Sequence, residues 1–343
     1  MSARTLRWLW SLAIPAGLTA DGRANGAARL TIIRHHRVFR EDERPLHRLG
    51  VRASVLAAQV ELLKGSGLGP VTVAEGLARL EEGRPGHWVA LSFDDGYADN
   101  VALALPLLAA ARARATFYLT AGLMEQRRAP WWDVLAHALE TTRATRLSWE
   151  VDEALFQMSL EGPHARAAAL HRLLPAFRVP PPEQSRRLVS LRAALGVVET
   201  APCELATWNV AEALASADME VGAHTLSHPF LSLLGADEQF AEIAGSIELI
   251  GRRLGVRPSG LAYPGGDYDA RTVAAARSAG LAYAVTTRAG ENGPAMPRFE
   301  LLRRGLYEGA CLAPGGRFSQ RLALAELGGA FDGMRAARRA PGS

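Results

Sequence analysis

Short apolar runs alternate along this chain with amphipathic stretches of helical length. Strands are predicted over 30–34, 70–73, 88–93, 115–119, 219–223, 259–263 and 281–286. Helices are predicted over 54–64, 74–81, 98–112, 207–217, 236–254 and 270–279. Alternation of strands and helices is typical of a parallel sheet, because each return to the sheet needs a crossover connection. The pattern therefore predicts an α/β protein.

One long stretch, residues 122–206, interrupts the alternation. It is rich in Ala, Leu, Arg and Glu, which predicts a helical insertion, and prolines 180–182 are expected to end its helical runs. We expect residues 1–27 to form an N-terminal segment, 28–311 the α/β unit, and 312–343 a peripheral C-terminal segment with one helix. Length alone allows one domain with an insertion or two domains.

Polar residues directly follow two of the predicted strands. The run 88–97 reads Trp-Val-Ala-Leu-Ser-Phe-Asp-Asp-Gly-Tyr, so Asp94 and Asp95 end an apolar strand. A second strand ends in Ala-His-Thr-Leu-Ser-His-Pro, which contains His224 and His228. An isolated Asp-Asp-Gly is more often a solvated turn, and an isolated His-x-x-x-His more often binds no metal. Together, at the ends of two similar strands, they favour one shared site.

The residue types of these two segments predict a metal site. Two imidazoles and a carboxylate suit Zn²⁺ at a catalytic centre that keeps one position open. Neighbouring residues at a strand end point in different directions, so one of Asp94 and Asp95 can bind the metal while the other acts as a base. A metal that lowers the pKa of water and a carboxylate that accepts its proton together hydrolyse an amide or an ester.

The segments Phe-Asp-Asp-Gly and His-Thr-x-Ser-His-Pro resemble the first two motifs of the polysaccharide deacetylases, carbohydrate esterase family 4. The resemblance extends over roughly residues 28–308. It implies a distorted or incomplete (β/α)7 barrel that carries the helical insertion. It also implies that Asp94 is the catalytic base and that Asp95, His224 and His228 hold a divalent metal. Zn²⁺ is expected first, with Co²⁺, Ni²⁺ and Mn²⁺ as alternatives.

The third motif of that family matches only in part. The family usually has Arg-Pro-Pro-Tyr-Gly, where this chain has Ala-Tyr-Pro-Gly-Gly at 262–266. The resemblance implies that Gly265 offers its backbone N–H to the oxyanion and that Tyr263 lies at the substrate. It also implies that the arginine that orients the base is lost, because Ala262 stands in its place. A plain Tyr-Pro-Gly-Gly turn is the alternative interpretation.

The general acid is expected at the start of the chain. Commoner members carry it in a C-terminal Leu-x-His segment, which is absent here. The first strand ends instead in Arg34-His35-His36-Arg37-Val38, which resembles the Tyr-His-Arg-Val opening of a permuted branch of the family. The resemblance gives His36 the role of acid and puts His35 in place of the tyrosine. Two solvated histidines beside a basic turn are the alternative.

Aromatic and basic residues suggest further contacts with a glycan. Trp131 and Trp132 in the insertion are candidates to stack on sugar rings, although packing of the insertion onto the barrel is the preferred interpretation. Arg303 and Arg304, after a candidate edge strand, either bind an acidic sugar or phosphate or are solvated. The expected activity is removal of N-acetyl groups from a sugar of an exopolysaccharide or of a lipid-linked glycan precursor. The alternatives are a noncatalytic glycan-binding protein on the same fold and an amidohydrolase of a small non-sugar amide.

The composition of the chain excludes some classes of binding partner. The net charge is only +4 over 343 residues and the arginines are scattered, so no nucleic-acid partner is expected. The two cysteines, Cys203 and Cys311, form no closely spaced pair of the kind that marks a structural zinc site. No apolar run is long enough to cross a bilayer. Residues 4–20 are interpreted as an amphipathic segment that makes peripheral membrane contact on a cytoplasmic protein, with a short signal sequence as the alternative.

Overall fold

The computed structural model describes residues 28–83 and 85–332, whose centre is one parallel seven-stranded sheet. The strand order is β10-β9-β8-β5-β4-β1-β11. The strands are β1 (Ala28–His35), β4 (Gly86–Phe93), β5 (Ala115–Leu119), β8 (Glu220–Ala223), β9 (Gly260–Ala262), β10 (Tyr283–Val285) and β11 (Arg304–Gly305). Apart from β11, neighbours in the sheet follow chain order. The predicted α/β fold is confirmed as a distorted (β/α)7 barrel.

The segment between β10 and β11 brings the two edges of the curled sheet together. Leu301 forms a parallel bridge with Val285 of β10, and Arg304 pairs with Ile33 of β1. Strand β1, although it comes first in the chain, therefore lies between β4 and the last strand. Arg303 stands between the two bridging positions, which places it within the closure of the barrel.

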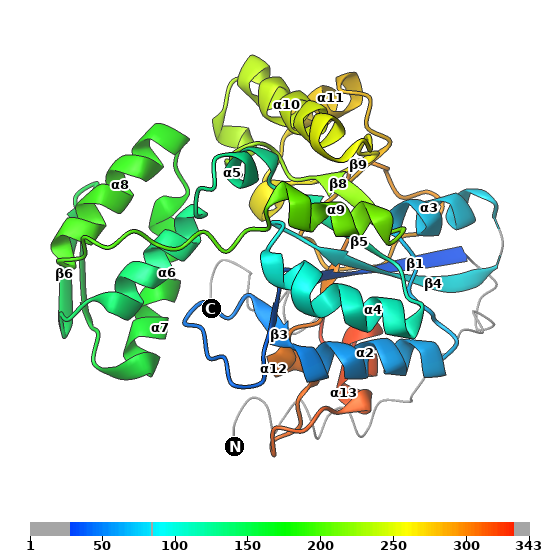
Figure 1. Cartoon of the computed structure of the whole chain (residues 1–343), viewed down its shortest axis with the longest axis horizontal. Coiled ribbons are helices and arrows are strands. Elements are labelled where there is room, and N and C mark those ends of the chain that lie inside the picture. Colours follow the sequence, from blue (N-terminus) through cyan, green and yellow to red (C-terminus); the bar gives the residue numbers. More distant parts are fainter. Residues whose placement is uncertain (1–27, 84, 333–343) are drawn as a thin grey trace.

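Helices cover the outside of the sheet (Figure 1). They are α2 (Ala53–Gly65), α3 (Val73–Glu81), α4 (Leu105–Ala111), α9 (Trp208–Ser216), α10 (Ala236–Leu254) and α11 (Ala270–Ser278). The predicted helices agree with these within a few residues, except that α4 is preceded by a π-helical turn, Asn100–Ala104. The strand expected over 70–73 is reduced to one isolated bridge between Val71 and Ala90.

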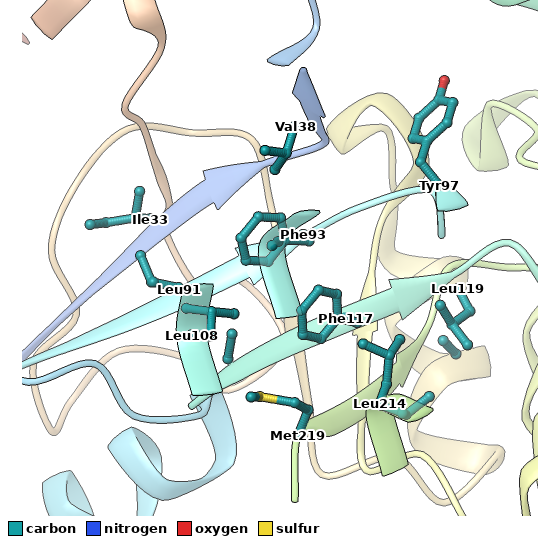
Figure 2. Packing of buried hydrophobic residues seen from close by; sticks show 14 of the residues in the cluster. Ile33, Val38, Leu91, Phe93, Tyr97, Leu108, Phe117, Leu119, Leu214 and Met219 are labelled. Atoms are coloured by element: carbon teal, nitrogen blue, oxygen red, sulfur yellow. The ribbon is translucent and has the colours of Figure 1, made fainter. Parts of the chain in front are cut away.

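Apolar side chains are buried on both faces of the sheet, because successive residues of a strand point to opposite faces. Figure 2 shows the layer between the sheet and its helices, which includes Ile33, Leu91, Phe93, Phe117 and Leu119. The inside of the curl is filled by Leu30, Ile32, Ala90, Tyr118, Ala262 and Val285. The inside is narrow: a Cβ atom on Gly222 would lie 2.4 Å from the Tyr118 ring. There is no room for a ligand between the strands, so a binding site has to lie beyond the strand ends.

The insertion forms a separate group of elements beside the barrel (Figure 1). It contains α6 (Trp131–Thr141), the hairpin β6 (Arg146–Val151) and β7 (Ala154–Ser159), α7 (Gly162–Leu173) and α8 (Pro181–Ala194). The short helix α5 (Ala121–Glu125), which precedes this group, packs in the main core. It has an apolar core of its own. The prediction that prolines 180–182 end a helix was wrong. Pro181 and Pro182 open α8, where a missing N–H loses no helical hydrogen bond. The hairpin was not predicted.

Short elements complete the described chain. Strands β2 (Arg37–Phe39) and β3 (Gly50–Arg52) form a small parallel sheet after β1. Helices α12 (Glu308–Cys311) and α13 (Gln320–Leu327) follow β11. Ala323 and Leu327 are buried in the main core, so the described part of 312–343 is not peripheral as expected.

Several expectations concern the chain ends and the cysteines. Cys203 and Cys311 are not joined by a disulfide. No helix within 28–83 and 85–332 has the length and apolar character needed to span a membrane. Residues 1–27, including the amphipathic segment expected over 4–20, lie outside the described part of the chain.

Candidate active site

The predicted site residues meet beyond the carboxyl ends of three strands of the sheet, β1, β4 and β8, with β5 between β4 and β8. Asp94 and Asp95 follow β4, His36 follows β1, and His224 follows β8. The Asp94 N–H donates to the carbonyl of His35, and the His224 N–H donates to the carbonyl of Leu119, each at 3.0 Å. The side chains of both aspartates and of His224 are buried. Charged groups in such a place need partners, because burial removes their hydration.

Asp95, His224 and His228 are arranged as a candidate metal site. Their ligand atoms all lie within 4.8 Å of one another. Asp95 Oδ1 is 3.4 Å from Nε2 of His224 and 3.6 Å from Nε2 of His228. Ligands held about 2.0–2.2 Å from a tetrahedral Zn²⁺ stand roughly 3.3–3.5 Å apart, so the spacing fits such an ion.

The hydrogen bonds and protonation of the two histidines also suit a cation. His224 Nδ1 donates to the carbonyl of Ala262 at 2.7 Å, which leaves the Nε2 lone pair facing the Asp95 carboxylate. Two acceptors that face each other are stabilised by a positive charge between them, either a proton on Nε2 or a metal ion. Burial lowers the pKa of His228 to about 3, so its imidazole is neutral, as a ligand must be. The pKa of His224 is raised overall. Burial by itself would lower this pKa, but the nearby carboxylate of Asp95 has the larger, opposite effect.

The backbone at this site adopts a conformation that is uncommon for residues with side chains. Asp95 has φ 74°, Thr225 has φ 65° and His228 has φ 57°, all in the left-handed region. Such angles persist only where the surroundings fix them, and they cluster at functional sites. Here the Thr225 hydroxyl accepts from the His228 N–H, and Glu242 accepts from the N–H groups of Leu226 and Ser227.

Asp94 is held by an arginine whose role the sequence did not reveal. Arg303 Nη1 donates to Asp94 Oδ1 at 2.6 Å, and Nη2 donates to Oδ2 at 2.8 Å. Burial raises the pKa of Asp94, but the charge of Arg303 outweighs it, so this pKa lies well below its usual range. Arg303 itself is 1% exposed and donates from Nε to the carbonyl of Thr286. Asp94 is therefore ionised and fixed in orientation.

Two expectations about arginine are corrected by this contact. The interpretation that the base lacks an orienting arginine was wrong, because Arg303 supplies one from the closure of the barrel although Ala262 replaces the motif residue. Arg303 is neither solvated nor available to an acidic substrate, since it is buried against Asp94. Arg304, in β11, is paired with Asp332 at 2.6 Å. The only signal in the sequence was a pair of arginines after the apolar residues 301–302.

His35, the last residue of β1, and His36, which follows it, lie on opposite sides of the sheet. His36 Nε2 is 3.9 Å from Asp94 Oδ2, and the His36 carbonyl accepts a hydrogen bond from Asn100 at 2.7 Å. His35 stacks on Phe93 in the outer layer, with ring centroids 5.3 Å apart. Burial lowers the pKa of both histidines, that of His35 to about 3. The structure brings His36, and not His35, to the candidate base, and His35 is not solvated.

The segment 262–266 follows β9 at the same end of the barrel. Gly265 is exposed and has φ 60°, a conformation that glycine adopts readily. Tyr263 is fully buried, and its hydroxyl donates to the carbonyl of Phe299 at 3.0 Å. The expectation that the Tyr263 side chain contacts the substrate was therefore wrong. The side chain is part of the core instead.

The tryptophan pair joins the insertion to the site. The Trp132 ring lies 4.3 Å from that of His228, and its indole N–H donates to the Tyr97 hydroxyl at 2.8 Å. Tyr97 in turn donates to Asp133 at 2.9 Å. At 4% exposure Trp132 is part of the wall behind a candidate ligand, which agrees with packing of the insertion onto the barrel rather than stacking on sugar. Trp131 is partly exposed and stacks on Phe177 at 5.5 Å.

Comparison with known proteins gives one family and one fold. Residues 81–284 match the family model described as polysaccharide deacetylase. No curated protein matches the chain. The solved structures that it resembles include the Streptococcus pyogenes deacetylase PplD in complex with acetate, at 18% identity and a TM-score of 0.56, over 84% of this chain and 96% of that one.

Two further solved structures agree with this result. IcaB from Ammonifex degensii is 17% identical with a TM-score of 0.55, over 88% of this chain and 97% of that one. The BpsB deacetylase domain from Bordetella bronchiseptica is 15% identical with a TM-score of 0.50, over 83% and 96%. At these identities the likeness establishes the shared fold.

Proposed function

We propose that this chain, which belongs to the polysaccharide deacetylase family, is a metal-dependent hydrolase that removes N-acetyl groups from a sugar. The glycan is an exopolysaccharide or a lipid-linked precursor. The observation that carries the proposal is the ionised, buried Asp94, fixed by Arg303 beside the donor set of Asp95, His224 and His228. A base held beside a metal site is what hydrolysis of an amide requires.

Each residue of the site has a separate role in the proposed reaction. Asp95, His224 and His228 hold the metal, for which two imidazoles and a carboxylate favour Zn²⁺, with Co²⁺, Ni²⁺ and Mn²⁺ as substitutes. When bound, this ion supplies a Lewis acid for the acetyl carbonyl and lowers the pKa of water. Asp94 accepts the proton of the attacking water. His36, beside Asp94, donates a proton to the leaving nitrogen. The exposed backbone of Gly265 offers its N–H to the oxyanion.

The geometry favours catalysis over glycan binding alone. Burying a carboxylate and a guanidinium costs several kcal/mol per ion before pairing, which a noncatalytic binding protein has no reason to maintain next to three potential metal ligands. An amidohydrolase of a small non-sugar amide could use the same groups. It differs only in the substrate that it accepts.

Acetate release separates these functions. The protein is loaded with Zn²⁺ and incubated with N-acetylglucosamine oligomers and, in parallel, with simple amides such as N-acetylated amines. Release from the oligomers that stops on chelation and in Asp94→Asn supports the proposal. Release from the simple amides alone favours the small-molecule amidohydrolase. Binding of oligomers without release by the metal-loaded protein favours the noncatalytic alternative.

A further inference from the structure

A pocket of about 470 Å³ lies beside the loop that carries His228, on the side of the insertion, although no candidate metal ligand lines it. It lies between α5, the start of α6, helix α8 and the loop that carries His228. Ser227 lines it next to His228, and Trp131 lines it next to Trp132, whose ring is 4.3 Å from that of His228. Its volume is that of a small-molecule site. A group bound here would belong to a substrate whose N-acetyl group lies at the metal ligands.

All the charged side chains that line this pocket are positive. Arg127, Arg128 and Arg192 line it, and none of its lining residues is an aspartate or a glutamate. Arg127 donates to the carbonyls of residues 203, 205 and 206, and Arg192 donates to those of residues 198 and 199. These bonds to neutral carbonyls fix the guanidinium groups without cancelling their charge. Across the described ranges, none of the three arginines forms an ion pair with a carboxylate.

The acidic side chains on the surrounding elements are engaged elsewhere. Glu125, at the end of α5, accepts from Arg253 and from Trp208. Glu183, in the first turn of α8, pairs with Arg186 and Arg187. Glu242 of α10 accepts three hydrogen bonds from residues 226 and 227. Other arginines thus neutralise Glu125 and Glu183, whereas Glu242 is bonded only to neutral groups and keeps its charge beside Ser227. One carboxylate offsets the three arginines only in part, so the potential of the pocket stays positive.

The remaining lining groups supply hydrogen-bond donors. Gln126, Gln184, Ser185 and Thr200 contribute amide and hydroxyl groups. The indole N–H of Trp131 is buried and has no acceptor among the residues described here. Because this nitrogen is shielded from solvent, it is not among the donors that the pocket presents to a ligand.

A second pocket on the other side of the site shows that this charge is local. It has a volume of about 270 Å³ and is lined by Arg37 and Arg44 together with four carboxylates, those of Glu43, Asp133, Glu140 and Glu204. The chain is rich in arginine throughout, yet these arginines are accompanied by acids. No acid lines the first pocket, so its excess of arginines does not follow from composition alone.

We propose that the pocket lined by Arg127, Arg128 and Arg192 binds an anionic group, a phosphate or a carboxylate, carried by the glycan next to the N-acetylated sugar. This inference rests on the proposed deacetylase function and narrows its substrate to an acidic glycan or a phosphate-linked one. Arg128 is the residue to test, because it has no hydrogen bond or ion pair within the described chain through its side chain. Guanidinium groups suit both anions, since their donors match two oxygens at once.

The experiment measures binding separately from catalysis. Calorimetry with the Zn²⁺-loaded Asp94→Asn protein compares N-acetylglucosamine 1-phosphate, a hyaluronan tetrasaccharide, which carries carboxylates, and neutral chitotetraose. Arg128→Glu is expected to weaken binding of the preferred anionic ligand by ~10-fold or more, as loss of a charged hydrogen bond does, and to leave chitotetraose unchanged. Arg128→Lys should restore part of the affinity. Arg172→Glu is the matched control, because Arg172 lies exposed on α7 of the same insertion and outside the pocket.

Each outcome decides the proposal. A selective loss for the phosphate ligand identifies phosphate as the anion, and a selective loss for hyaluronan identifies carboxylate. Equal anion affinity in Arg128→Glu and the parent protein, or equal losses in Arg172→Glu, overturns the proposal. Anion binding through Arg128 without acetate release by the Zn²⁺-loaded wild-type protein from any glycan would keep the pocket and reject the deacetylase function. Acetate release from neutral oligomers, with no preference for anionic ligands, would support the deacetylase function and reject the anion-binding pocket.

Discussion

The Arg303 guanidinium donates one hydrogen bond to each carboxylate oxygen of Asp94, across 209 positions of the sequence. Both side chains are buried, so each is the compensating charge of the other. The pair joins β4 to the segment that closes the barrel between β10 and β1. The same contact that closes the fold therefore also sets the charge and the orientation of the candidate base.

Replacing Arg303 with methionine should impair both activity and its pH dependence. Burial, no longer opposed by a cation, would raise the pKa of Asp94, so the acidic limb of kcat/KM should move to higher pH because the base must be deprotonated. Activity at the optimum should fall by ~10²-fold, as for a misplaced catalytic group. A pH–rate profile of the variant, with its metal content measured, checks this. An unchanged acidic limb would show that Arg303 does not set the pKa of Asp94.

The two adjacent carboxylates should respond differently to the same substitution. Asp94→Asn should keep the metal and lose turnover by ~10²-fold or more, the usual value of general base catalysis. Asp95→Asn should lose metal affinity, because Asp95 Oδ1 faces both candidate ligand histidines. Elemental analysis and steady-state kinetics of both variants test this. Equal metal loss in the two would mean that their roles are reversed or shared.

Removal of either histidine ligand should lower metal content. His224→Ala and His228→Ala each leave two protein ligands, which is too few for a stable catalytic Zn²⁺ site. We expect less than stoichiometric zinc after dialysis, while the wild-type protein retains it. His171→Ala is a control, because His171 lies exposed on α7. Stoichiometric zinc in the two ligand variants would refute the assignment.

The acid role of His36 can be separated from a structural one by the choice of substrate. An amide needs a proton on its leaving nitrogen, whereas an activated acetate ester does not. His36→Ala should lose ~10²-fold or more on an N-acetyl sugar, while keeping its metal and most of its activity on the ester. Equal losses on both substrates would indicate a structural or ligand role instead.

His35→Ala is the matched variant for that experiment. His35 packs on Phe93 in the outer layer and does not reach the carboxylates, so its truncation should reduce stability by about 1–3 kcal/mol. Its amide-to-ester ratio should stay at the wild-type value. Denaturant unfolding and the two assays measure both effects, and a changed ratio would place His35 in the chemistry.

Several features of the site followed from sequence because they are local. Period-two alternation and apolar runs placed Asp94, Asp95, His36 and His224 directly after strands, and parallel strands bring their ends to one edge of a sheet. The same alternation explains why His35, at the end of β1, and His36, directly after it, point in opposite directions. His35 shares its face with Ile33 under the helices, so His36 faces the other way, toward Asp94.

Other features were not predictable from local sequence. The hairpin β6–β7 lies in a stretch of helix-favouring composition, and Pro181 opens a helix instead of ending one. Proline is equally at home in the first turn of a helix and after its end, so its presence alone does not say which side of it is helical. The resemblance placed Tyr263 at the substrate, but packing buries it. Trp132 is also buried, in agreement with the preferred interpretation that the tryptophans pack the insertion onto the barrel.

The sequence by itself determined the fold class and the residues from which the site is built, because strand periodicity and motif spacing are properties of consecutive residues. Only the tertiary structure decided which charges meet. Arg303 reaches Asp94 through a closing strand of two residues, Arg304–Gly305, too short to leave a periodic pattern. The arginine-lined pocket likewise exists only where the insertion packs beside the loop of His228. Charge pairing depends on distance in space, and distance in space is set by how the whole chain packs.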